Sequence, residues 1–121
     1  DRVFLPGDKG EIGWLHAGGG RLALWHRPGG KACLKLRTIA GATAVLTLLH
    51  EREGAETIGH QVQAAGLDWT WCPLDGANSA YLESDEAVAS LVQATVGAVC
   101  LLRAGGSVLV HCSAGIPNRT G

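Results

Sequence analysis

Residues 107–112 read Ser-Val-Leu-Val-His-Cys, a short apolar run that ends in a histidine and a cysteine. Its length and its β-branched residues predict a strand that is buried on both faces of a sheet. Residues 43–49 read Thr-Ala-Val-Leu-Thr-Leu-Leu and predict a second strand of the same kind. Strands buried on both faces belong mainly to sheets with helices on either side. The two runs therefore favour an α/β fold.

Helical and strand patterns alternate around these two runs. Gly41, Gly66 and Gly105 mark helix ends, and Asp85 and Glu86 suit the first turn of a long helix. The other expected elements are strands at 12–16, 21–25 and 67–72 and helices at 31–40, 51–65 and 84–104. The long helix is expected to bury Ala87, Leu91, Ala94, Ala98 and Leu101. This order predicts a central, mostly parallel sheet flanked by helices.

Composition limits the classes of protein that the chain can belong to. Its 121 residues are 46% hydrophobic and 17% charged, which predicts one packed domain over residues 1–121. A net charge of −1 argues against nucleic acid or an anionic membrane as a partner. No apolar run approaches the roughly 18 residues that span a bilayer. The sequence has no Met, so we expect a processed or excerpted chain.

The cysteines and histidines show no spacing that is typical of a metal site. Cys33, Cys72, Cys100 and Cys112 are widely separated, which favours free, buried thiols in a reducing, cytoplasmic compartment. The five histidines are scattered, and we expect neither a metal nor a cofactor. Four tryptophans are expected to pack in the core rather than to form a recognition surface; they are Trp14, Trp25, Trp69 and Trp71.

Cys112 stands where α/β folds bind their ligands, at the carboxyl end of a predicted strand. Gly115 and Gly121 permit tight turns, so successive backbone N–H groups can surround a small anion. Arg119 adds a fork of donors that can bind two phosphate oxygens at once. Such a positive field favours the thiolate form of Cys112, which is the nucleophile. The loop thus combines a nucleophile with an anion cradle.

Residues 110–115 (Val-His-Cys-Ser-Ala-Gly) and 119–121 (Arg-Thr-Gly) resemble the signature loop of the cysteine-dependent protein tyrosine phosphatase superfamily. The compact spacing is more similar to its dual-specificity or small bacterial members. The resemblance implies that Cys112 is the nucleophile, that Thr120 hydrogen-bonds its thiol, and that His111 orients the loop from beneath. It also implies a phosphate-binding set, namely Ser113, Ala114, Gly115, Ile116, Asn118 and Arg119.

A general acid is the other requirement of that family. Residues 71–76 (Trp-Cys-Pro-Leu-Asp-Gly) are similar to the family's acid loop, which implies this role for Asp75. The chemistry gives an independent reason, because an alkoxide or phenoxide leaves poorly unless it is protonated. The alternative is that Asp75 serves only as a turn residue, since Asp-Gly is a common turn pair.

The loop departs from the family pattern in one respect. Six residues separate Cys112 from Arg119, where the family has five. Either the loop bulges and Arg119 still reaches the anion, or Asn118 stands in the place of the arginine. Pro117 has no N–H to offer to phosphate. The family also continues past this loop into a helix, so we expect a domain truncated after the phosphate loop.

Three functions are consistent with these residues. The first is a phosphomonoester hydrolase that acts on a phosphorylated protein or another phosphomonoester through a cysteinyl-phosphate intermediate. The second is a catalytically inactive module that binds phosphate. The third is a thiol-based sulfurtransferase or arsenate reductase, which the order of Asp75 before Cys112 disfavours. Cys72 is also a candidate partner for an oxidised Cys112, provided that the fold brings the two close together.

Overall fold

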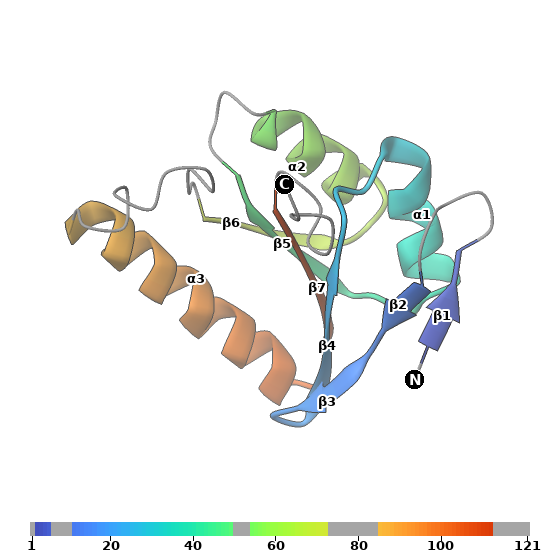
Figure 1. The fold of residues 1–121 in the computed structure, drawn as a ribbon, viewed down its shortest axis with the longest axis horizontal. Coiled ribbons are helices and arrows are strands. Elements are labelled where there is room, and N and C mark those ends of the chain that lie inside the picture. The colour runs from blue at the N-terminus through green and yellow to red at the C-terminus, as the bar shows by residue number, and fades with distance from the viewer. Residues whose placement is uncertain (1, 6–10, 50–53, 73–84, 113–121) are drawn as a thin grey trace, which may run out of the picture.

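The computed structural model describes residues 2–5, 11–49, 54–72 and 85–112. Within these ranges four strands come first, and helices and strands then alternate, as Figure 1 shows. The elements are β1 (Arg2–Phe4), β2 (Glu11–Gly13), β3 (Leu15–Ala17), β4 (Gly20–Trp25), α1 (Gly30–Thr38), β5 (Ala44–Leu48), α2 (Ala55–Ala64), β6 (Asp68–Cys72), α3 (Asp85–Arg103) and β7 (Ser107–Cys112).

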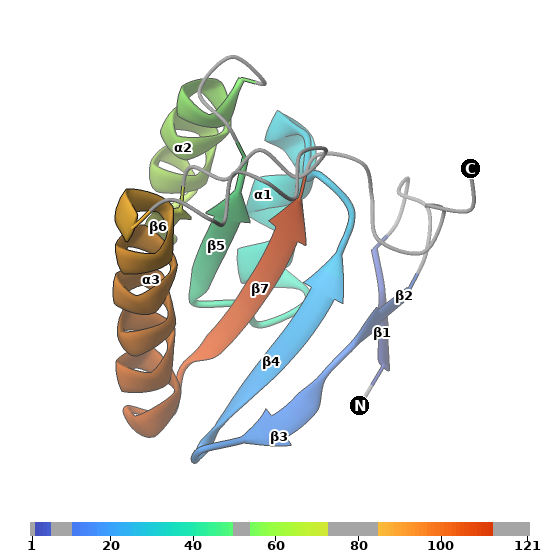
Figure 2. The ribbon, with the colours of Figure 1, turned by 60° about the vertical axis from the view of Figure 1, so that its left-hand side comes forward.

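The central sheet has the strand order β3-β4-β7-β5-β6. Strands β4, β7, β5 and β6 run parallel, and β3 pairs antiparallel with β4 at one edge. The last strand of the chain, β7, therefore lies in the middle of the sheet between β4 and β5 (Figure 2). The prediction of an α/β fold with a mostly parallel sheet is confirmed.

Helices cover both faces of this sheet. Figure 2 shows α3 in front of the sheet and α1 and α2 behind it. Side chains of β7 alternate between two cores: Leu109 packs on the side of α1 and α2, and Val108 and Val110 pack on the side of α3. Val45 and Leu46 of β5 alternate in the same way. Both strands are thus buried on both faces, as the two apolar runs predict.

The predicted helix ends agree with the structure at three glycines. Gly41, Gly66 and Gly105 follow α1, α2 and α3, and all three have the positive φ that glycine adopts most readily. The predicted start of the second helix at residue 51 is wrong. Helix α2 begins at Ala55, because its N-cap Gly54 has a φ of 89°, which an α-helix does not permit.

The predicted strand at 12–16 is wrong, because the structure divides this segment at Trp14. Strand β2 pairs with β1 in a separate two-stranded sheet, and β3 pairs with β4 in the central sheet. The Trp14 side chain is buried at the junction, with the Arg21 guanidinium carbon 4.7 Å from its ring centre. The burial of Trp14 and Trp25 confirms their predicted place in the core.

Helix α3 confirms part of its predicted buried stripe and corrects one cysteine. Ala94 and Ala98 are buried and Leu101 is partly buried, whereas the side chains of Ala87 and Leu91 lie outside the description. Cys100 is exposed on α3 and not buried as expected, because it lies off the stripe that faces the sheet. Among the described helices, none is long and apolar enough to cross a membrane.

Candidate active site

Cys112 is the last residue of β7, at the carboxyl edge of the parallel strands. Its strand neighbour in β5 is Leu48, and in the preceding register position His111 lies between Trp25 of β4 and Thr47 of β5. The backbone of Cys112 thus lies on a central strand, at the carboxyl end of the parallel strands, where α/β folds bind ligands. The structure describes the backbone of this residue and not its side chain.

The remaining predicted site residues fall outside the described residues. They are Asp75 and the loop that contains Ser113, Ala114, Gly115, Ile116, Asn118, Arg119 and Thr120. The structure fixes the points from which these segments leave the sheet. Cys72 ends β6 and Cys112 ends β7, and both are paired with Leu48 of β5. The segment with Asp75 and the segment with Arg119 therefore both begin at the carboxyl end of the sheet, after strand residues that are in register with each other.

The same register argues against a disulfide between Cys72 and Cys112. One strand separates them, and adjacent strands lie about 4.8 Å apart, so their Cα atoms are roughly 10 Å apart. A disulfide needs Cα atoms within about 7 Å. Burial also raises the pKa of the Cys72 thiol, which keeps it protonated. The condition under which Cys72 could serve as a redox partner is not met by this fold.

Buried polar groups lie directly beneath the carboxyl end of β7. His111 and Thr47 are both 0% exposed, and His111 Nε2 lies 2.8 Å from Thr47 Oγ1. Trp69 Nε1 of β6 donates to the same Thr47 oxygen, also at 2.8 Å. The three side chains connect the three neighbouring strands β6, β5 and β7. Thr47 has no role that its local sequence predicts, since its one mark is a hydroxyl within an otherwise apolar run.

Trp71 secures the end of β6 beside this group. Its ring stacks on that of Trp69, with centres 5.7 Å apart and planes 15° apart. Its Nε1 donates to the Leu49 carbonyl oxygen at 2.8 Å. Because Leu49 follows β5, this bond holds the ends of β5 and β6 together. Trp69 and Trp71 thus lie on one face of β6.

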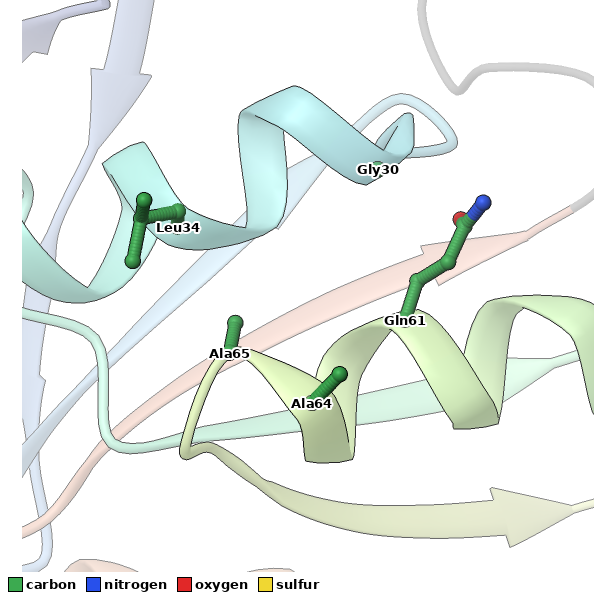
Figure 3. Close-up of a pocket in the computed structure, with 5 residues that line it drawn as sticks. All are labelled: Gly30, Leu34, Gln61, Ala64 and Ala65. Atoms are coloured by element: carbon green, nitrogen blue, oxygen red, sulfur yellow. The ribbon is translucent and has the colours of Figure 1, made fainter.

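Two hollows lined by described residues are mostly apolar. One, of about 250 Å³, lies between α1 and α2 and is lined by Gly30, Leu34, Gln61, Ala64 and Ala65 (Figure 3). Another, of about 420 Å³, is lined by Arg2, Gly13, Trp14, Leu15 and Leu24. Apolar groups dominate both linings. The described part of the chain contains no group of three or more His, Cys, Asp or Glu residues that could hold a metal ion.

Comparison with solved structures supports the α/β fold described above. The chain is similar to the crystal structure of a protein from Shewanella putrefaciens CN-32 described as "Putative phosphatase (DUF442)". The two are 25% identical with a TM-score of 0.60, and the match covers 85% of this chain and 61% of that one. This chain thus spans about three fifths of that protein's length. No family model matches the chain, and no curated protein matches it. The fold is phosphatase-like.

Proposed function

We propose that the protein is a cysteine-dependent phosphomonoester hydrolase of the dual-specificity type. One observation carries this proposal: the His111–Cys112 pair ends the central parallel strand of a phosphatase-like sheet. The sequence after it supplies the glycine, arginine and threonine of a phosphate loop. The proposed substrate is a phosphorylated protein or another phosphomonoester.

The proposed reaction has two steps. The Cys112 thiolate attacks phosphorus, the P–O bond to the leaving group breaks, and Asp75 gives its proton to the departing oxygen. Arg119 and the backbone N–H groups of residues 113–116 and 118 bind the phosphoryl oxygens. Asp75, now a carboxylate, takes a proton from water, which cleaves the S–P bond and releases phosphate and the thiolate. Thr120 hydrogen-bonds the sulfur as it leaves.

The register of the sheet supports the role of Asp75. Asp75 is three residues beyond Cys72, and three residues extend over at most roughly 11 Å. Because Cys72 and Cys112 are roughly 10 Å apart at the same edge, a loop of this length can bring the carboxyl to the substrate of Cys112. A residue at the amino ends of the strands could not reach that substrate.

Hydrolysis of a small aryl phosphate tests the proposal. We expect turnover by the 121-residue chain at mildly acidic to neutral pH, and none above background in the Cys112→Ser variant. Asp75→Asn should retain binding of inorganic phosphate but lose about 10²-fold or more in kcat. Equal turnover by the chain and by Cys112→Ser would refute the cysteine mechanism. Near-normal turnover by Asp75→Asn would refute the acid assignment.

The extra residue in the loop favours a second candidate, an inactive module that binds phosphate. Misplacement of a clamp by about 1 Å can cost roughly 100-fold in rate, and six residues stand where the family has five. Deletion of Pro117 restores the shorter spacing. An inactive chain that binds phosphate, and that gains activity when Pro117 is deleted, would establish this second candidate. An active chain that loses activity on the same deletion would exclude it.

A further inference from the structure

The hydrogen bonds at Thr47 have a direction that the geometry determines. An indole N–H can only donate, so Trp69 Nε1 gives its hydrogen to Thr47 Oγ1. The Thr47 hydroxyl keeps one hydrogen of its own, and Thr47 is fully buried. A buried hydroxyl hydrogen without an acceptor destabilises the folded state, because it has given up its hydrogen bond to water. Among the described residues, His111 offers the acceptor for this hydrogen, because its Nε2 lies 2.8 Å from Thr47 Oγ1.

We infer that Thr47 and Trp69 are positioning residues that hold His111 in one neutral tautomer, with its proton on Nδ1 and its Nε2 accepting from Thr47. The reverse arrangement places two donors, Nε1–H and Nε2–H, on one hydroxyl oxygen and leaves the Thr47 hydrogen unused. The chain of bonds therefore runs from β6 through β5 to β7 in a single direction.

The consequence falls on the residue next to His111. An imidazole held by this hydrogen bond cannot leave its rotamer without breaking the bond, and this restrains the residue from which the chain continues to Cys112. This part of the inference rests on the proposed function, because the position of Cys112 matters for catalysis only if Cys112 is the nucleophile. The tautomer of His111 does not depend on that function and can be measured alone.

Two substitutions of Thr47 separate the hydroxyl from the shape of the side chain. Thr47→Val keeps the branched shape and removes the hydroxyl, whereas Thr47→Ser keeps the hydroxyl and removes a methyl group. Thr43→Val is a matched control, because it makes the same exchange at the amino end of the same strand run. There Thr43 bonds to Ser107 and not to the histidine.

The first measurement is the ring ¹⁵N spectrum of His111 in the histidine-labelled chain. We expect a protonated Nδ1 and an unprotonated Nε2 in the unsubstituted chain, in Thr47→Ser and in Thr43→Val. Thr47→Val should lose this tautomer preference. A proton on Nε2 in the unsubstituted chain would overturn the inference without any variant, so a failure of Thr47→Val to fold does not protect it.

The second measurement is the rate of Cys112 alkylation by iodoacetamide, read by mass spectrometry against the exposed Cys100. We expect Thr47→Val to slow Cys112 alkylation about tenfold, and Thr47→Ser to restore the rate. An unchanged tautomer and rate in Thr47→Val would overturn the inference and leave the proposed function standing. If Cys112 reacts no faster than Cys100 in the unsubstituted chain, the proposed function fails and the tautomer result still decides the inference.

Discussion

Gly59 lies where α2 crosses the indole of Trp69, and at this residue a single atom decides the packing. A Cβ added at Gly59 would collide with three carbons of the Trp69 six-membered ring. The absence of a side chain therefore brings α2 close to β6 and leaves Trp69 in the position from which its N–H reaches Thr47. Gly97 is also in a helix, but a Cβ there would meet nothing within 4 Å.

We predict opposite effects from the same exchange at these two glycines. Gly59→Ala should lower the free energy of unfolding by about 1–3 kcal/mol, because the added methyl displaces a packed ring. Gly97→Ala should raise it by about 0.5–1 kcal/mol, because alanine is the better helix former and has open space. Urea unfolding followed by circular dichroism measures both. Equal effects at the two sites would show that the contact with Trp69 is not decisive.

A second prediction at this scale concerns the buried thiols. Burial raises the pKa of both Cys33 and Cys72 above their ordinary value, so the unfolded chain loses these protons at lower pH than the folded chain. The stability that results is complete below the ordinary thiol pKa of about 8.5 and is lost as the pH rises above it. The free energy of unfolding should therefore be flat near pH 7 and should fall toward pH 10.

Lysine and tyrosine also titrate in this range, so the Cys33→Ala variant is the control. Its fall in stability between pH 7 and pH 10 should be shallower than that of the unsubstituted chain. Identical slopes would mean that Cys33 ionises as readily in the folded state as in the unfolded one.

Among the elements, local patterns predict more than long-range pairing does. The apolar runs predict β5 and β7, and the glycines predict the helix ends, because burial and positive φ leave marks in the local sequence. The division of residues 11–17 at Trp14 is not marked, since the apolar residues continue through it. The bonds from Trp69 to Thr47 and from Thr47 to His111 join residues 22 and 64 positions apart, which no local pattern reveals.

The two ends of the sheet strands should differ in their response to mutation. At the amino end, Thr43 Oγ1 accepts from the Ser107 N–H at 2.9 Å, and Arg21 Nε donates to Ser107 Oγ at 2.9 Å. Thr43→Val removes that acceptor and should cost about 1 kcal/mol of stability. Ser107 lies five residues before Cys112, roughly 17 Å along the strand, so aryl phosphate turnover should not change. Lost turnover at full stability would contradict this division between the two ends.

At the scale of the whole molecule, the order of the strands implies an order of stability. Strand β7 is paired on both sides, and strands β5 and β7 are covered by helices on both faces. Strands β1 and β2 pair only with each other among the described elements, and Phe4 of β1 is 66% exposed. A two-stranded sheet is marginally stable by itself. Cys112 thus lies on one of the two strands, β5 and β7, that are paired on both sides and covered on both faces.

Native-state hydrogen exchange should resolve this order. We predict that the amides of β7 and β5 exchange only through global unfolding, with one common free energy, because no partial opening exposes the centre of the sheet. The amides of β1 and β2 should exchange through a local opening of lower free energy that does not respond to small amounts of denaturant. Exchange of β7 at the rate of β1 would mean that the centre of the sheet opens locally. In that case, the strand that ends at Cys112 could not serve as a rigid base for the proposed phosphate loop.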